Sequence, residues 1–401
     1  MSPTEAELRA ALAAVDDPLL RRGVVELGML GRVEADRRGV SIGLVVPVAG
    51  WPAAEELAAR VRDAVASVPG VRDVSVEVRA MADDERPRLH AALAAPEGGE
   101  PAALGGPGAG HPHGHGHLHG GPGGAPRPLG HEEGRPNRFM VAGSRTRVVG
   151  VSSGKGGVGK SSVTVNLAVA LAAAGFDVGL LDADVYGFSA PKMLGVDREP
   201  VQIDDLLVPP VAHGVRCLSM GFFVPDDQPV IWRGPMLHKA LEQFLVDAYW
   251  GEPDFLLVDM PPGTGDVALS LGQYLPRAEV LVVTTPQPAA QRVAQRSAYA
   301  ARKLKMAVRG VIENMSWFTG DDGTRYELFG AGGGGQLAAA LEVPLLGQVP
   351  LVPAVRQGAD EGVPVRAAAP DGEAAVAFDA LARRVVELGP ARVYRSELSV
   401  R

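Results

Sequence analysis

The sequence predicts an α/β fold in which a mostly parallel sheet is covered by helices on both faces, preceded by a small α+β domain. From about residue 145 onward, short apolar runs alternate with helical stretches, as in strands joined by helical crossovers. The runs predicted as strands are 148–151, 178–181, 255–258, 280–283, 308–312 and 345–349. A glycine-rich loop follows the first of these strands. It precedes a helix predicted over 161–174, which Gly175 ends.

The first 95 residues predict a separate α+β unit. Apolar periodicity indicates a helix at 5–15, a strand pair within 31–46, a helix at 52–68 and a strand at 71–78. Between residues 96 and 144, Gly and Pro dominate and large apolar side chains are scarce, so burial cannot offset the entropy of ordering this segment. We therefore expect a small domain over 1–95, a flexible linker over 96–144 and a larger domain over 145–401.

Composition narrows the classes of protein to consider. With 401 residues, 46% of them hydrophobic, the chain is expected to be soluble and to form sizeable cores. A net charge of -8 and the absence of a Lys/Arg block argue against nucleic-acid binding. No run of eighteen apolar residues occurs, and the start, MSPTEAELRAAL, lacks the features of a signal peptide. We expect a cytoplasmic protein without membrane partners.

The glycine-rich loop has the spacing of a phosphate-binding loop, G-x-x-x-x-G-K-[ST]. In such a loop, backbone N–H groups surround phosphates, Lys160 neutralises β/γ charge and the Ser161 hydroxyl coordinates magnesium. Strand, loop and helix follow in the order that the motif requires. The fold class is therefore a P-loop NTPase. The predicted nucleotide-binding residues of the loop are Gly154, Lys155, Gly156, Gly157, Val158, Gly159, Lys160, Ser161 and Ser162.

Lys155 is a second lysine in this loop, and placing it beside Lys160 costs repulsion unless an anion compensates. A lysine that reaches phosphates across a dimer interface would explain it. The alternative is a solvated loop lysine. We therefore predict an ATPase that works as a homodimer.

Acidic residues end two of the predicted strands. Asp182 and Asp184 follow the strand at 178–181, and Asp259 follows the strand at 255–258. Strand ends in such a sheet gather ligand groups at one edge, so these carboxylates are candidates for magnesium or water contacts. The residues predicted to hold magnesium are Ser161, Asp182 and Asp259. For Asp182 the alternative of a helix cap stays open.

The segment after Asp259 reads MPPGTGD, and its Gly263 can offer an N–H to a γ-phosphate and move when that phosphate leaves. Asp266 ends this segment. It either contributes to the site or caps the following helix.

Several separated segments resemble the Mrp/ApbC family of iron–sulfur cluster carrier ATPases, part of the MinD/ParA-like class. They are SSGKGGVGKSSVTVNLA, LLDADVYGFSAPKMLG, WRGPM, DMPPGTGD and IENMSWF, and the resemblance spans about 148–364. The front domain resembles the iron–sulfur assembly-associated domain that many members carry, with DDP at 16–18 and ELG at 26–28.

The resemblance implies ATP with Mg²⁺ as the nucleotide. It also implies that Asn314 lies near the adenine, that Lys155 reaches the partner subunit's nucleotide and that Asp184 positions the attacking water. The implied catalytic residues are Lys155, Lys160 and Asp184. The implied partners are a second copy of the chain and apo iron–sulfur proteins or an assembly scaffold.

The cysteine pattern departs from the family. Members usually carry Cys-x-x-Cys shortly after the Asn-Met segment, whereas this chain has WFTGDDG at 317–323. The front domain has Gly50-Trp51-Pro52 where relatives place a cysteine before proline. Four thiolates usually hold a [4Fe–4S] cluster, and Cys217 alone cannot supply them. We predict Cys217 to be a small core residue in a buried strand. We therefore expect no stable thiolate-bound [4Fe–4S] cluster, and any cluster that binds would do so without evident cysteine ligands.

Two other functions stay open. The linker histidines, His111, His113, His115, His117 and His119, could bind nickel or zinc in a metallochaperone ATPase. Alternatively, their rings have no fixed geometry and no function. A MinD/ParA-like positioning switch is the other possibility. The mixed charge of 371–388 does not favour the basic membrane helix that such switches use.

Overall fold

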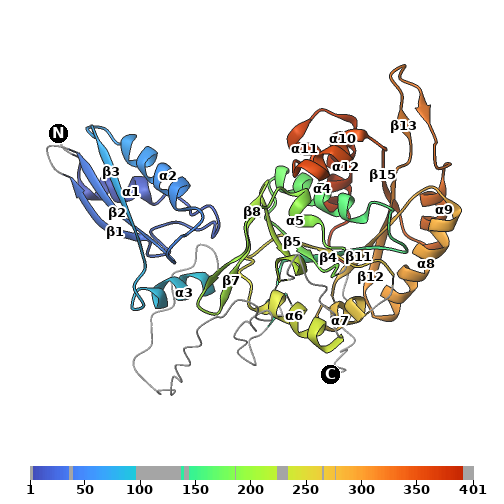
Figure 1. Ribbon diagram of the computed structural model, residues 1–401, viewed down its shortest axis with the longest axis horizontal. Helices are drawn as coiled ribbons and strands as arrows, with labels where there is room; N and C mark the ends of the chain where they lie inside the picture. The colour runs from blue at the N-terminus through green and yellow to red at the C-terminus, as the bar shows by residue number, and fades with distance from the viewer. Residues whose placement is uncertain are drawn as a thin grey trace, which may run out of the picture. The chain divides into compact units, whose positions relative to one another are not determined.

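A computed structural model shows how the elements of this chain are arranged (Figure 1). It describes residues 3–35, 39–95, 137–139, 144–185, 187–223, 234–263, 266–275 and 277–391. The described residues form two compact units, the first containing 3–95 and Val201–Val208 and the second the rest. The predicted domain boundaries stay predictions. Most of the predicted linker, including its histidines, lies outside the described residues.

The first unit contains a three-stranded sheet in the order β1 (Leu30–Ala35), β2 (Val40–Val46), β3 (Val74–Ala80). β1 and β2 are antiparallel, whereas β2 and β3 are parallel. Helices α1 (Glu5–Leu12) and α2 (Ala54–Ala66) pack on it, as the sequence predicts. The unit also contains α3 (Arg86–Ala94) and the hairpin β6 (Val201–Ile203) and β7 (Leu206–Val208), which were not predicted.

The second unit contains an eight-stranded sheet in the order β15, β12, β11, β4, β10, β5, β9, β8. Its pairs are parallel apart from β8 with β9. The strands are β4 (Arg147–Ser153), β5 (Val178–Asp182), β8 (Val211–Ala212), β9 (Val215–Ser219), β10 (Phe255–Asp259), β11 (Glu279–Thr284), β12 (Ala307–Asn314) and β15 (Leu345–Val349). All six strands predicted from apolar runs are therefore confirmed.

Helices cover both faces of this sheet (Figure 1). α4 and α12 pack against each other on one face, and α6, α7 and α8 lie on the other. The helices are α4 (Lys160–Ala173), α5 (Ala190–Met193), η1 (Met220–Phe223), α6 (Gly234–Val246), α7 (Asp266–Tyr274), α8 (Pro288–Lys303), α9 (Gly333–Leu341), α10 (Pro353–Glu361), α11 (Val365–Ala368) and α12 (Glu373–Glu387). No helix among the described residues is long and apolar enough to cross a membrane.

Burial explains why the central strands β5 and β10 are apolar up to their last residue. β5 and β10 are buried at every position because helices lie above and below them. Parallel pairing also brings the carboxyl ends of neighbouring strands to one edge, where Asp259 lies beside Asp182 in register. The polar residues that end β4, β5, β10 and β12 thus share that edge.

Candidate functional site

The predicted phosphate-binding loop joins β4 to α4 at the carboxyl edge of the sheet. Gly157 and Gly159 have φ values of 82° and 77°, a region that favours glycine, so these two glycines are required by the loop's backbone. Gly154 allows the loop to approach α8 closely, because a Cβ there would lie 2.2 Å from the Ala294 nitrogen. The predicted strand, loop and helix order is confirmed.

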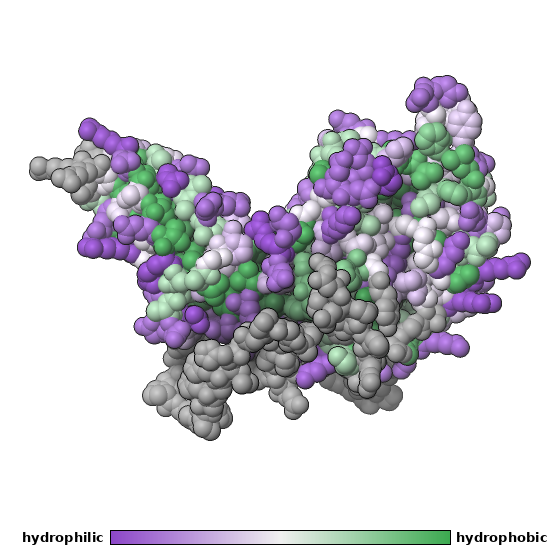
Figure 2. Space-filling view, viewed as in Figure 1, coloured by the Kyte–Doolittle hydropathy of each residue, from purple (hydrophilic) through white to green (hydrophobic). Residues whose placement is uncertain are grey.

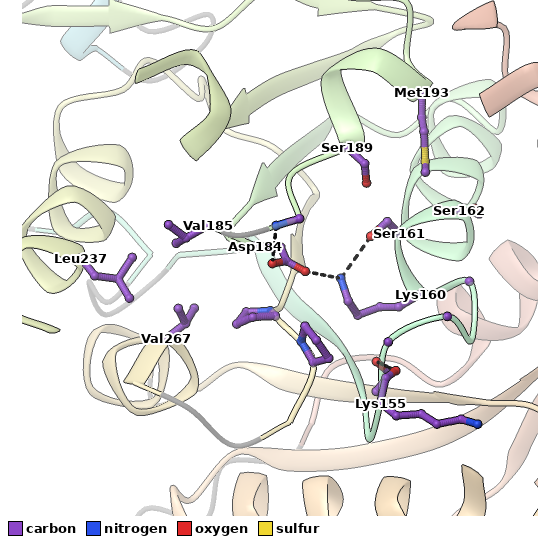
Figure 3. Close-up of a pocket in the computed structure, with 17 residues that line it drawn as sticks. Lys155, Lys160, Ser161, Ser162, Asp184, Val185, Ser189, Met193, Leu237 and Val267 are labelled. Carbon is purple, nitrogen blue, oxygen red and sulfur yellow. Dashed lines mark hydrogen bonds and ion pairs between the residues drawn. The ribbon is translucent and has the colours of Figure 1, made fainter. Parts of the chain in front are cut away.

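Lys160, Ser161 and Asp259 form a buried polar cluster at the start of α4. The Lys160 Nζ lies 2.7 Å from Asp259 Oδ1, and the Ser161 hydroxyl donates to Asp259 Oδ2 at 2.6 Å. Both side chains of this ion pair are buried, at 6% and 1% exposure. Asp184 contributes a second carboxylate 3.9 Å from Lys160 Nζ (Figure 3). The structure therefore brings together four of the residues predicted to act on phosphates and magnesium.

Thr164 also belongs to this cluster, although the sequence-based prediction omitted it. Its hydroxyl lies 2.8 Å from Asp259 Oδ1 and 2.9 Å from the Lys160 carbonyl, one helical turn earlier. The side chain is completely buried. Its place one helical turn after the loop lysine, on the same helix face, is the sequence signal that marks Thr164 as a candidate, although its contact with Asp259 is not visible in the sequence.

Asp182 is next to Asp259, but its oxygens are already engaged. They accept hydrogen bonds from the backbone N–H groups of Asp184, Ser189 and Ala190 and from the Ser219 hydroxyl. Burial, and then repulsion from the Asp259 carboxylate, raise the pKa of Asp182 to about 7. In this structure Asp182 holds the chain that leads into α5. The predicted magnesium contact remains a prediction.

Asp184 faces a cavity of about 790 Å³ above the loop. Its Oδ1 accepts from the Gly187 N–H at 3.1 Å, which orders the turn after β5. Part of the opposite wall is apolar, and Figure 3 shows Val185, Leu237 and Val267 on the side of Asp184 away from the loop. The loop residues that line the cavity are Lys155, Gly156, Gly157, Gly159, Lys160, Ser161 and Ser162.

The side chain of Lys155 points in a different direction from that of Lys160. Its side chain points away from Lys160 and Asp184 (Figure 3), and among the described residues it makes no ion pair. The Ser153 hydroxyl donates to its carbonyl at 3.1 Å. The Lys155 ammonium group is therefore not paired with Asp184 of its own chain in this structure.

Asn314 and Gly263 lie beside the loop but do not line the cavity. The Asn314 side-chain amide donates to the Val158 carbonyl at 2.9 Å, so it packs against the loop from the end of β12. The Gly263 N–H donates to the Ser153 carbonyl at 3.0 Å. In this structure the Gly263 N–H is therefore not directed at a phosphate position.

Two oxygen groups suited to magnesium meet beside the phosphate-binding loop. Mg²⁺ is a hard cation that prefers oxygen ligands, and the Ser161 hydroxyl and Asp259 carboxylate meet at the loop. These two residues therefore fit the ion. No group of three or more His, Cys, Asp or Glu side chains that could hold a metal ion occurs in the described parts of the chain.

Cys217 lies in β9 and is completely buried, which confirms its prediction as a core residue. Burial and, secondarily, the Asp182 charge raise the pKa of its thiol well above the usual value. The segment expected to carry Cys-x-x-Cys forms the hairpin β13 (Phe318–Thr319) and β14 (Arg325–Tyr326). Figure 2 shows hydrophilic residues at its tip, where Asp321 and Asp322 are exposed.

Comparison with known proteins identifies the family. A family model described as NUBPL iron-transfer P-loop NTPase matches residues 144–386. The chain belongs to this family. A second family model, described as iron-sulfur cluster assembly protein, matches residues 5–78 of this P-loop NTPase.

The P-loop NTPase is similar to curated proteins along most of its length. It is 43% identical to the iron-sulfur cluster carrier protein of Mycobacterium leprae over 362 residues, 88% of this chain and 85% of that protein. It is 39% identical to the iron-sulfur cluster carrier protein of Synechocystis sp. over 392 residues, 96% and 97% of the two chains.

A solved structure is also similar. The nucleotide-binding protein of Archaeoglobus fulgidus, in complex with ADP, is 32% identical with a TM-score of 0.50. The match covers 57% of this chain and 90% of that chain.

We predict that Thr164→Val weakens magnesium-dependent ADP binding by about tenfold, because the Asp259 carboxylate loses a buried donor while the side-chain shape is kept. The measurement is an ADP titration with and without Mg²⁺. Thr319→Val is the matched control, since the Thr319 hydroxyl also bonds a carboxylate, that of Glu373, away from the site. An unchanged magnesium dependence in Thr164→Val would show that Thr164 does not orient Asp259.

Proposed function

We propose that this chain is a magnesium-dependent ATP hydrolase that carries iron–sulfur clusters to apoproteins, acting as a homodimer in the cytoplasm. One observation carries the proposal: a single chain joins the Lys160, Ser161 and Asp259 cluster to a front domain that matches an iron–sulfur cluster assembly protein. The curated relatives named iron-sulfur cluster carrier proteins support it. Its proposed partners are apo iron–sulfur proteins or an assembly scaffold.

ATP is proposed to bind with its phosphates on the loop. The backbone N–H groups of the loop bind phosphate oxygens at the start of α4, where the helix dipole favours negative charge. Lys160 turns from Asp259 toward the β/γ-phosphates. Ser161 and Asp259 are the residues that would hold Mg²⁺, which neutralises phosphate charge when bound. We propose the adenine near Asn314, because this side chain already contacts the loop at Val158.

Hydrolysis is proposed to use Asp184 of the same subunit and Lys155 of the partner subunit. Asp184 lines the cavity next to Lys160, where a carboxylate can orient water for attack on the γ-phosphate. Lys155 points away from its own Asp184, which supports a role at the second nucleotide of a dimer. Gly263 is proposed to rotate its N–H toward the γ-phosphate once ATP is bound.

The first experiment measures ATP hydrolysis by the wild-type chain and by Asp184→Asn. We expect the variant to hydrolyse ATP about 100-fold more slowly with ATP affinity changed less than about threefold, because a water-positioning group acts mainly in the transition state. Asn keeps an oxygen that can accept the Gly187 N–H, so the turn should stay intact. A parallel loss of binding and rate would contradict the catalytic role of Asp184.

The cluster is proposed as cargo that is held transiently, since the chain has one cysteine and that residue is buried. Four thiolates are the usual ligands of a [4Fe–4S] cluster.

After anaerobic reconstitution and removal of small thiols, we therefore expect iron and sulfide to be lost, in both the wild-type chain and Cys217→Ala. Iron and sulfide analysis with absorbance spectra checks this, and a chain lacking residues 111–119 tests the linker histidines. Near-stoichiometric cluster that persists in Cys217→Ala would contradict the ligand analysis.

A further inference from the structure

The segment that follows Asp259 lies against β4 through backbone hydrogen bonds. The Met260 N–H donates to the Val151 carbonyl at 3.1 Å, and the Gly263 N–H donates to the Ser153 carbonyl at 3.0 Å. Gly263 has a φ of 89°, and a Cβ built there would meet no atom within 4 Å. The backbone conformation, rather than steric crowding, therefore requires glycine here. We call this arrangement the resting position of Gly263.

Two buried serine hydroxyls connect this glycine to the strand before the phosphate-binding loop. Ser297 of α8 and Ser152 of β4 are 4% and 3% exposed, and their Oγ atoms lie 2.8 Å apart. The Ser297 hydroxyl also lies 3.4 Å from the Gly263 carbonyl. A carbonyl only accepts, so Ser297 donates to Gly263 and Ser152 donates to Ser297. We call this the hydroxyl chain.

Helix α8, which carries Ser297, packs closely against the phosphate-binding loop. A Cβ on Gly154 would lie 2.2 Å from both the Ala294 nitrogen and the Val293 carbonyl carbon, so the helix backbone touches the first residue of the loop. Ser297 is one turn further along the same helix. Because close-packed elements do not shift independently, α8 and the loop hold the donor of the Gly263 carbonyl in place.

We propose that Ser297 is a positioning residue that stabilises the resting position of Gly263 and thereby opposes the response to a γ-phosphate. This inference rests on the proposed function, in which the Gly263 N–H must leave the Ser153 carbonyl to reach that phosphate. The Gly263 N–H and carbonyl belong to different peptide planes, so the proposal includes that both planes move together and that the carbonyl leaves Ser297 when the N–H leaves Ser153. ADP lacks a γ-phosphate and does not require the rotation. The hydroxyl chain should therefore weaken ATP binding and leave ADP binding unchanged.

The resting position is tested first without nucleotide, by amide hydrogen exchange of peptides that contain Gly263. We expect Ser297→Ala to exchange at least about twofold faster there, because one supporting hydrogen bond is lost. Ser270→Ala is the matched control, since this buried serine of α7 contacts His238 instead. Unchanged exchange in Ser297→Ala would overturn the proposal.

The response to the γ-phosphate is tested with Mg-ADP and a nonhydrolysable ATP analogue. In Ser297→Ala we expect the analogue to bind about threefold more tightly and ADP affinity to stay the same, because a weak hydrogen bond opposes only the rotated state. Equal shifts for both nucleotides would indicate a merely structural role. Weaker analogue binding would mean that Ser297 supports the rotated state. Both results contradict the proposal.

Ser152→Ala interrupts the same hydroxyl chain from its other end, so it provides a second test if Ser297→Ala does not fold. It should shift the analogue affinity in the same direction, and the double variant should shift it no further than either single variant. Additive shifts would contradict the proposal that both serines act through one hydroxyl chain.

Failure of the proposed function can be distinguished from failure of this inference. If the wild-type protein binds neither nucleotide, the proposed function fails, whereas the hydrogen-exchange experiment still decides whether the serines hold Gly263.

Discussion

The Asp259 carboxylate is the constraint on which the candidate site depends. It is completely buried, and Lys160, Ser161 and Thr164 of α4 all contact it. Removing one partner of a buried ion pair commonly costs about 3 to 5 kcal/mol, so this carboxylate fixes where α4 begins relative to β10. The same contacts hold the start of α4, at the end of the loop, against β10. In the proposed function, binding of a nucleotide exchanges the contact of Lys160 with Asp259 for contacts with phosphates.

Local signals in the sequence predicted most of the second unit. Apolar runs indicated the strands and the spacing of Gly154 to Ser161 indicated the loop, because both depend on residues close together in the chain. The contacts of Thr164 and Ser297 could not be predicted this way, since their partners lie 95 and 145 residues away. The order of strands in the sheet and the packing of α8 against β4 bring those residues together.

Sequence patterns also did not decide which contacts the Asp182 carboxylate and the Gly263 N–H make. For Asp182 they allowed a magnesium ligand or a cap, and the structure shows the capping contacts without deciding the magnesium role. For Gly263 the motif indicated a γ-phosphate contact. In the structure its N–H donates to the Ser153 carbonyl instead, and the phosphate contact remains a proposal. A motif specifies which residues take part, but not the position that they occupy before ligand binds.

The carrier proposal is tested most directly by measuring transfer of a preformed, thiol-supported cluster to an apoprotein, with the chain present and with or without Mg-ATP. The account predicts faster transfer with ATP, and no acceleration by Lys160→Ala, because no other described cation occupies the place of Lys160 beside Asp259. Lys303→Ala, an exposed lysine of α8, is the control. Transfer that is equally fast without ATP, or with Lys160→Ala, would contradict an ATP-dependent carrier.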